Sequence, residues 1–379
     1  MSKREFTVAN EYHYNQSSPV RWIISHIMRY PYLPLGMAVA AILEHVFMAY
    51  TAILVGRAFS WITGPQPVLR DLAAIALSVA GVRAVHALLG IGRSYSIEWL
   101  AQFLERDCRD ELYISLLGKS QTYHGRQRVG DLMARATNDV RQINLLASPG
   151  IGMFFDTVTG VAVPIVTIAL LRPELITVPV IFAILLVITL RQYNSKLNPV
   201  SNAMRQQFGV MNAGLAESIS GIEVVKAYAQ EEQEYDKFSK NAVKFRDLFV
   251  ERGRVQARYF PFLVYSVIFG AALLHAFLVY RRGVGFGVGD IIAFMGLVGQ
   301  LRFPTFNSLW SFSLIQMGVT SAERLLEIIN TETELDENEQ VVAKPIEGEI
   351  VFDHVTFGYS RDNPVLKDIT FRAAPGETI

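Results

Sequence analysis

Several ionisable side chains lie inside segments that are otherwise apolar enough to cross a membrane. Glu44 and His45 lie near the middle of one such segment, and Arg83 and His86 lie near the middle of the next. Ionisable groups at membrane depth are costly and suggest a partner or a function. Residue counting puts Glu44 and Arg83 at about the same depth, which predicts a Glu44–Arg83 pair, either as a structural tie between helices or as part of a substrate cavity or proton-linked site. Asp156, low in a third segment, is within reach of His86 by the same counting, with a structural role as the favoured interpretation and a functional role as the alternative.

A later apolar segment holds further polar side chains around a proline. Gln300, Arg302 and Asn307 surround Pro304 in this stretch. Proline frees a backbone carbonyl and can kink a membrane helix. We therefore regard these three side chains as candidates for a contact with substrate.

The sequence offers no nucleotide, disulfide or metal chemistry of its own. A phosphate-binding loop needs consecutive backbone N–H groups and a lysine, and no G-x-x-x-x-G-K-[ST] motif occurs in the 379 residues. The glycine-rich stretch "GVGFGVGD" (283–290) lacks a lysine and is expected to be a flexible turn. Cys108 is the single cysteine, which excludes an internal disulfide. The histidines show no metal-ligand spacing, so no metal site is predicted.

The composition indicates that these side chains are positioned by membrane helices. Hydrophobic residues make up 51% of the chain and charged residues only 18%, against about 25% charged in soluble domains. A bilayer core needs about 20 apolar residues in a helix. Six stretches meet this requirement, at approximately 33–55, 72–92, 147–171, 174–190, 260–281 and 290–315. The chain is therefore predicted to be an all-α polytopic membrane domain with six spans.

The connections between the spans differ greatly in length and charge. The connections 93–146 and 191–259 each exceed 50 residues and are rich in lysine and arginine, whereas the other three are short. The positive-inside rule places both long connections and both termini in the cytoplasm. The proline-free patterns "GDLMARATNDVRQI" and "LAESISGIEVVKAYAQEE" have helical periodicity. We expect the membrane helices to extend about 35–40 Å beyond the bilayer as stalks.

Shorter elements are expected at the two ends of the chain. The stretch "PVRWIISHIMRYPY" has the pattern of an amphipathic helix with interfacial aromatic residues, for which a buried soluble helix is the alternative. Near the other end, "GEIVFDHVTFGY" and "PVLKDITF" alternate as strands, with a phase shift at Asp353-His354, and 377–379 are expected to begin a third strand. The predicted domains are 1–32 with the interfacial elbow helix, 33–329 with the six spans, 330–346 as a linker, and 347–379 as the opening of a soluble domain that is expected to be incomplete.

These features together resemble one family, the ATP-binding cassette (ABC) exporters with a type-I exporter transmembrane domain. The stretch "GDLMARATNDV" resembles the first cytoplasmic loop of that family, and "ESISGIEVVKAYAQE" resembles the second. The stretch 348–379 resembles the opening of its nucleotide-binding domain, an α/β P-loop ATPase. The resemblance covers nearly the whole chain. It implies that the strand beginning at 377–379 leads into the phosphate loop, so that this chain alone is not expected to be catalytic.

The resemblance also implies a mechanism and partners. It implies one half of a homodimeric or heterodimeric transporter in the plasma (inner) membrane, using ATP with Mg in the intact protein to export an amphipathic small molecule or lipid by alternating access. Tyr359 then corresponds to the aromatic residue that stacks on adenine. The resemblance further implies coupling segments that contact the nucleotide domain, unless these are plain helix-hairpin packing: Gln121, Tyr123 and Gly125 in the first loop, and Gly221, Glu223, Lys226 and Tyr228 in the second.

Two other functions remain open from the sequence alone. One is a membrane scaffold or regulatory subunit that pairs with a separate ATPase and does not itself hydrolyse ATP. The other is a channel, which needs a continuous polar pore, and the apolar fourth and fifth spans disfavour it. Neutral net charge gives no indication of nucleic-acid binding.

Overall fold

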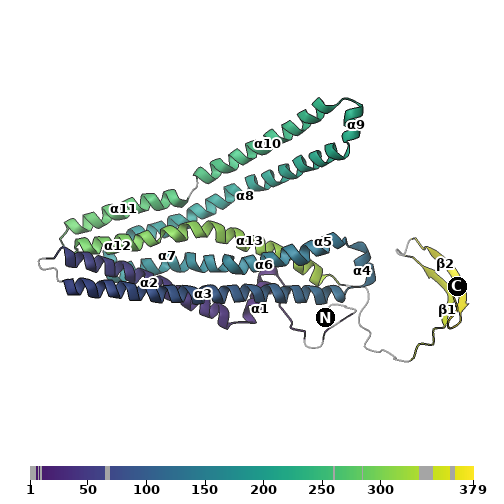
Figure 1. The fold of residues 1–379 in the computed structure, drawn as a ribbon, viewed down its shortest axis with the longest axis horizontal. Coiled ribbons are helices and arrows are strands. Elements are labelled where there is room, and N and C mark those ends of the chain that lie inside the picture. Colours follow the sequence, from purple (N-terminus) through teal and green to yellow (C-terminus); the bar gives the residue numbers. More distant parts are fainter. Residues whose placement is uncertain are drawn as a thin grey trace.

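The protein is a long helical bundle followed by a small two-stranded sheet (Figure 1). The computed structural model describes residues 6, 8, 11–64, 69–258, 261–283, 285–332, 345–358 and 363–379. The predicted all-α membrane domain followed by strands is confirmed. Most of the predicted linker and Tyr359 lie outside the described residues.

Five of the six predicted spans correspond to helical stretches that are long and apolar enough to cross a membrane. Four of them contain α2 (Tyr32–Ile62), α3 (Leu69–Leu117), α7 (Gly152–Leu171) and α8 (Thr177–Ser220), and the fifth is Val264–Arg281 of α11 (Pro261–Arg281). A short 3₁₀ turn, Pro173–Leu175, joins α7 to α8. Because α3 has 49 residues, it is about 73 Å long, more than twice the thickness of a bilayer core.

The sixth predicted span is divided into two helices. Helix α12 (Val288–Gln300) ends one residue before α13 (Arg302–Asn330) begins, with Leu301 between them. Pro304 lies in the first turn of α13, where its missing N–H leaves no intrahelical bond unmade. Pro304, which was expected to kink the sixth span, therefore lies just after the junction between α12 and α13.

The helix that leads into the third span is also interrupted. It runs through α5 (Val129–Ala134), a π-helical turn (Arg135–Asp139), α6 (Val140–Leu145) and a second π-helical turn (Leu146–Ile151) before α7. Ser148 has φ −123° and ψ 115°, values outside the helical region. Pro149 follows Ser148, and a residue before proline is disfavoured in the helical region by steric contact.

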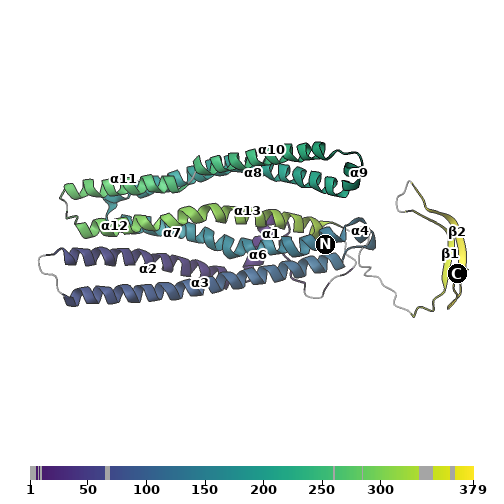
Figure 2. The ribbon, with the colours of Figure 1, turned by 45° about the horizontal axis from the view of Figure 1, so that its top comes forward.

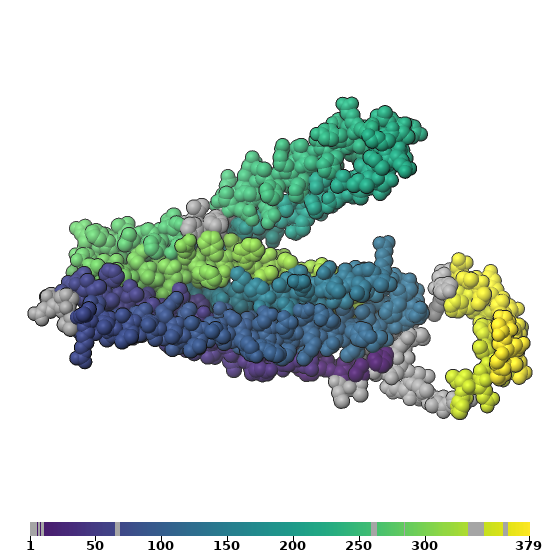
Figure 3. Space-filling model, in the orientation of Figure 1, coloured from purple at the N-terminus to yellow at the C-terminus, as the bar shows by residue number. Residues whose placement is uncertain are grey.

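The predicted stalks are present, and one pair stands away from the rest. Helix α8 continues beyond its apolar part, turns through the short helix α9 (Ile222–Ala227) and returns as α10 (Glu231–Arg258). We call α8 beyond 191 together with α9 and α10 the arm. The arm diverges from the remaining helices in Figure 1 and forms a separate layer beside them in Figure 2, and Figure 3 shows open space between its tip and the body. No described residue of α10 is buried.

Two apolar clusters hold the body together. One joins α1, α3, α6 and α13 through residues such as Trp22, Leu104, Ile143 and Leu325. The other joins the opposite ends of α8, α11 and α12, with Phe182 and Leu297 among its members. The first cluster lies at the stalk end of the body and the second within the spans, so the two ends of the bundle are packed separately.

Helices α2 and α12 approach each other very closely at two glycines. A Cβ atom built on Gly56 would lie 2.4 Å from the backbone oxygen of Gly289 and 2.6 Å from Cβ of Ala293. Small residues allow membrane helices to pack at such short distances. This contact sets the position of α12 relative to α2.

The ends of the chain form the predicted short elements. Helix α1 (Pro19–Met28) packs its face with Trp22 and Ile23 into the first cluster, and Ser18 caps its N-terminus by accepting a bond from Arg21 N. Strands β1 (Ile350–Phe357) and β2 (Leu366–Ala373) pair antiparallel. Their register shifts between Phe352 and Val355, which confirms the predicted phase shift at Asp353-His354. Residues 377–379, which were expected to begin a third strand, are not in a strand in the described part of the chain.

Candidate functional site

A charged network connects α2, α3 and α7 inside the helical stretches that are long and apolar enough to cross a membrane. Arg93 of α3 donates from Nε to Glu44 Oε2 of α2 at 2.7 Å, and from Nη1 to Asp156 Oδ2 of α7 at 3.1 Å. All three side chains are less than one-fifth exposed. One guanidinium therefore serves two carboxylates. We call Glu44, Arg93 and Asp156 the intramembrane network.

Two histidines lie beside the intramembrane network. His86 Nε2 is 3.8 Å from Glu44 Oε1. His45 Nδ1 lies 2.8 Å from the backbone oxygen of Ala41 and 3.2 Å from Thr159 Oγ1. The side chains that could exchange protons here thus come from three helices, which is how proton-binding groups occur in membrane proteins.

Glycines allow the helices around the network to approach each other. A Cβ on Gly90 would lie 3.2 Å from Glu44 Oε1, so the backbone of α3 passes beside that carboxylate. A Cβ on Gly160 would lie 2.7 Å from Pro304 Cγ and 2.9 Å from His45 Nε2. The network is therefore enclosed by α3 on one side and by the contact of α7 with α13 on the other.

The predicted Glu44–Arg83 pair is wrong. The guanidinium that pairs with Glu44 belongs to Arg93, ten residues further along α3, while Arg83 is exposed. Residues 83, 86, 90 and 93 share one face of the helix. Glu44 lies level with residues 90 and 93 of this face. Counting depth from the ends of the spans missed this, because α2 and α3 both extend beyond the predicted spans. Asp156 likewise contacts Arg93 rather than His86.

The three polar residues near Pro304 have different environments. Gln300 Nε2 donates to the backbone oxygen of Met48, which ties α12 to α2. Asn307 is 6% exposed and lies inside the packing of α13, whereas Arg302 is exposed. The structure does not bring the three side chains to one place, and their contact with a substrate stays a prediction.

The tip of the first predicted loop is the short helix α4 (Gln121–Arg126), which contains Gln121, Tyr123 and Gly125. Ser120 caps it by accepting a bond from Tyr123 N at 3.3 Å. Lys119 is 3% exposed and donates to the backbone oxygens of Ile329 and Thr331 at the end of α13. The end of α3, the tip helix and the end of α13 are thereby joined.

A cavity of about 290 Å³ lies beside this joint. Arg135 spans its wall, with Nη1 2.8 Å from Glu327 Oε2 and Nε 3.1 Å from Asp131 Oδ2. One turn away, Arg324 pairs with the buried carboxylate of Asp139. These ion pairs connect the helices before and after the spans at the stalk end.

The tip of the second predicted loop is α9, at the end of the arm. Gly221 and Tyr228 flank it, and Glu223 and Lys226 lie within it. Lys226 Nζ pairs with Glu231 Oε1 at 2.9 Å. Val224 is 61% exposed and Tyr228 is 74% exposed. The arm tip therefore carries exposed apolar side chains, and its contact with a nucleotide domain stays a prediction.

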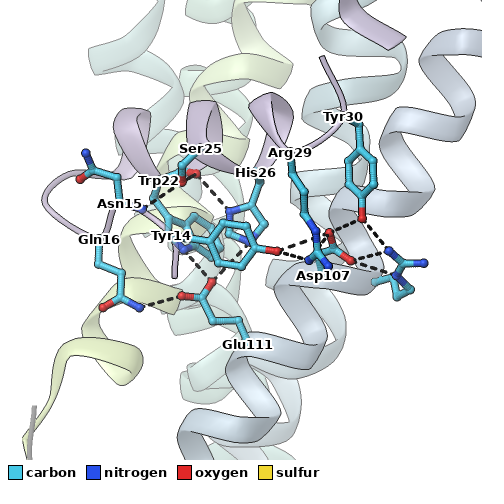
Figure 4. A network of polar contacts seen from close by, with 11 residues as sticks. Tyr14, Asn15, Gln16, Trp22, Ser25, His26, Arg29, Tyr30, Asp107 and Glu111 are labelled. Atoms are coloured by element: carbon cyan, nitrogen blue, oxygen red, sulfur yellow. Dashed lines mark hydrogen bonds and ion pairs between the residues drawn. The ribbon is translucent and has the colours of Figure 1, made fainter. Parts of the chain in front are cut away.

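A second buried polar network fixes the elbow helix α1 against α3 (Figure 4). Glu111 accepts bonds from Trp22 Nε1 at 2.8 Å and from Gln16 Nε2 at 2.7 Å, and lies 3.3 Å from His26 Nε2. Asp107, one turn away, pairs with Arg29 at 3.0 Å. We call these residues, with the others drawn in Figure 4, the elbow network.

Burial in the elbow network shifts the ionisation of its members. The pKa of the Tyr14 phenol is raised, chiefly by burial, and burial also raises the pKa of Tyr30. The thiol of Cys108, between Asp107 and Glu111 in sequence, has its pKa raised well above the ordinary value by burial first and then by the neighbouring carboxylates. Sequence reasoning missed Asp107 and Glu111. Their spacing of four residues on the same helix face as Leu104 and Cys108 was a signal for buried carboxylates.

A pocket of about 260 Å³ lies at the opposite end of the bundle, between α2, α7 and α12. Its floor includes Ile168, Leu175 and Leu297, which are buried. Arg57, Arg172 and Asp290 also line it. Arg172 lies 3.7 Å from Asp290 Oδ2 and donates to the backbone oxygen of Gly285 at 2.7 Å. The pocket thus has apolar and charged lining residues.

Comparison with known proteins identifies the bundle. Residues 35–305 match the family model described as the ABC transporter transmembrane region. A Bacillus subtilis protein named "Probable multidrug resistance ABC transporter ATP-binding/permease protein" is 28% identical over 74% of this chain and 48% of its own length. The ATP-dependent lipid A-core flippase of Methylobacillus flagellatus is 26% identical over 79% of this chain and 51% of its own length.

A further relative gives the same result. A multidrug resistance-like ATP-binding protein of Buchnera aphidicola is 25% identical over 80% of this chain and 52% of its own length. The chain spans about half the length of these curated relatives. All of the intramembrane network lies inside residues 35–305, the part of the chain that matches the family model.

Proposed function

The chain belongs to the ABC transporter transmembrane-region family, as a type-I exporter transmembrane domain, and we propose on this basis that it forms one half of a dimeric, ATP-driven exporter. The proposed cargo is an amphipathic small molecule or a lipid, moved by alternating access across the plasma membrane. Names of the relatives, which include multidrug and lipid A-core transporters, support this class of cargo.

The observation that supports the proposal best is the pair of stalk tips. Helices α4 and α9 lie at the ends of helices far longer than a bilayer requires, and α9 exposes apolar side chains at the end of an arm that its own chain does not cover. Such tips fit a mechanism in which a soluble ATPase moves membrane helices as rigid bodies between two arrangements. The arm fits a body supplied by a second chain.

ATP with Mg is proposed for the intact protein only. The described strands β1 and β2 form a two-stranded sheet without a phosphate-binding loop, so the residues present do not fit the nucleotide phosphates. We derive no step through ATP from this chain. Tyr359 remains the proposed adenine-stacking residue, and both termini are proposed to lie in the cytoplasm.

Reconstitution of the intact protein in lipid vesicles tests the export function. ATP hydrolysis is measured while a panel of lipids and amphipathic cations is added one at a time, and we expect at least one to stimulate it. A flat response to every compound argues against the multidrug or lipid class. Absence of any ATP hydrolysis by the intact protein supports the alternative of a scaffold that pairs with a separate ATPase.

A variant pair tests the role of the arm tip. Tyr228→Ala removes an exposed aromatic side chain from the tip, and Val210→Ala removes an exposed side chain from the shaft of the same arm. We expect Tyr228→Ala to reduce the amount of substrate moved per ATP hydrolysed, and Val210→Ala to leave that ratio unchanged. Equal effects of the two substitutions would show that the tip has no special part in coupling.

A further inference from the structure

We propose that the carboxyl group of Asp156 is a proton-binding site, which takes up and releases one proton as the membrane helices change arrangement. The proposal deepens the proposed export function, since it assigns a bound ion to the transport cycle. It rests on the contacts of the intramembrane network, on an unpartnered oxygen and on a break in the helix that positions Asp156.

Two carboxylates share one cation in the intramembrane network. Arg93 forms one hydrogen bond with Glu44 and one with Asp156, so neither carboxylate has the two parallel bonds that a guanidinium can give to a single partner. The bond to Glu44 is 2.7 Å long and the bond to Asp156 is 3.1 Å long. Glu44 is thus the better-paired carboxylate, and Asp156 is the one for which a proton is the missing partner.

One carboxylate oxygen of Asp156 lacks a hydrogen-bond donor in the described part of the chain. This oxygen, Oδ1, is buried. An ionised carboxylate with a buried oxygen and no donor is far more costly than a neutral carboxyl in the same place. Binding of a proton forms an O–H bond on Asp156 and leaves Glu44 and Arg93 as a neutral ion pair.

The surrounding charged groups leave this assignment intact. On α2, the neighbours are Glu44 and His45, and His45 already faces Ala41 O and Thr159 Oγ1. On α3, His86 faces Glu44 rather than Asp156, and Arg83 lies about 15 Å along the helix from Arg93. On α13, the helix that packs against α7, the charged residue nearest in sequence to the contact at Pro304 is Arg302, which is exposed.

A break in the helix precedes the segment that carries Asp156. The non-helical Ser148 and the π-helical turn Leu146–Ile151 precede α7, and Asp156 follows Ser148 by only two turns. Interruptions of this kind are frequent at functional sites in helices. A rotation of α7 about this break would separate Asp156 from Arg93 and open its oxygens to water, where the O–H bond breaks and the proton leaves as hydronium.

Infrared difference spectroscopy on the intact protein in lipid vesicles tests the site without requiring transport. The readout is the carbonyl stretch of a protonated carboxylic acid and its shift in D₂O, recorded between acidic and alkaline buffer. We expect Asp156→Glu to move the band, because the acid that bears the proton is changed, while Glu44→Asp leaves it in place. Asp290→Asn, at the far end of the spans, is the control and should also leave it in place.

The outcomes separate the two proposals. A band that is moved by Glu44→Asp and not by Asp156→Glu, or the absence of any such band, overturns the assignment to Asp156. Asp156→Asn should also abolish the dependence of substrate-stimulated ATP hydrolysis on pH, and an unchanged pH profile counts against the proposal. If the band behaves as expected but no substrate is transported, the proton site stands and the export function fails.

Discussion

The close approach of α2 and α12 gives a prediction whose size can be worked out from the structure. Gly56→Ala places a methyl group 2.4 Å from the backbone oxygen of Gly289 and 2.6 Å from Cβ of Ala293. Neither atom is at the end of a flexible side chain, so the helices must separate. Overpacking of this kind costs about 1–3 kcal/mol of unfolding free energy.

A control within the same spans isolates the packing effect. Gly81 lies in α3, and a Cβ atom there would meet nothing within 4 Å. Both substitutions replace a helical glycine by alanine and share the same gain in helix propensity. The free energies of unfolding of Gly56→Ala and Gly81→Ala should therefore differ by about 1–3 kcal/mol, with Gly56→Ala the less stable.

The assay is reversible unfolding of the purified protein in mixed micelles by increasing denaturing detergent, followed by tryptophan fluorescence. Gly56→Val should lose more stability than Gly56→Ala, because the added methyl groups lie in the same contact. If Gly56→Ala is as stable as Gly81→Ala, α2 and α12 are not in close contact at this point. The position assigned to α12 relative to α2 would then be wrong.

Three further predictions concern the two polar networks. Glu44→Gln and Arg93→Gln should each reduce the free energy of unfolding, and the double variant should lose less than the sum of the two single losses. The losses from Arg83→Gln and Glu44→Gln should instead add within about 0.5 kcal/mol. Coupling of Glu44 to Arg83 would contradict the observed pair. Glu111→Ala leaves Trp22 Nε1 without its acceptor at 2.8 Å and should cost about 1–3 kcal/mol, with faster proteolysis before α2. Protease resistance equal to that of Glu105→Ala would refute this. Because burial raises the pKa of Cys108, a maleimide should label it slowly in the folded protein even at mildly alkaline pH and rapidly in denaturant, and fast labelling of the folded protein would exclude its burial.

The sequence predicted those parts of the fold that depend on local pattern. Apolar runs predicted six spans, of which five are helical stretches long and apolar enough to cross a membrane and the sixth is divided into α12 and α13. Proline-free amphipathic patterns predicted the stalks, whereas the segments at their tips were implied by the family resemblance. The alternation around Asp353-His354 predicted the shift of register between β1 and β2. In each case the residues that decide the structure are neighbours along the chain.

The contacts of the candidate site depended on information that local pattern does not contain. Whether Glu44 meets Arg83 or Arg93 depends on how far α2 and α3 slide along each other, and a shift of two to three turns changes the partner. The elbow network depends on where α1 docks on the stalk of α3, which places Glu111 89 residues after its partner Trp22. The break at Ser148 arises from one residue before a proline inside an otherwise helical pattern.

The uncovered arm has a consequence for how the protein is handled in a cell. Three apolar side chains at the arm tip are about half exposed or more in the isolated chain: Ile219, Ile222 and Val224. A newly synthesised chain therefore exposes these apolar side chains until a partner binds there. Chaperones and degradation machinery recognise surfaces of that kind. A chain that has not assembled would then be degraded through its exposed arm. The steady-state amount of the protein would depend on how soon a partner covers that surface.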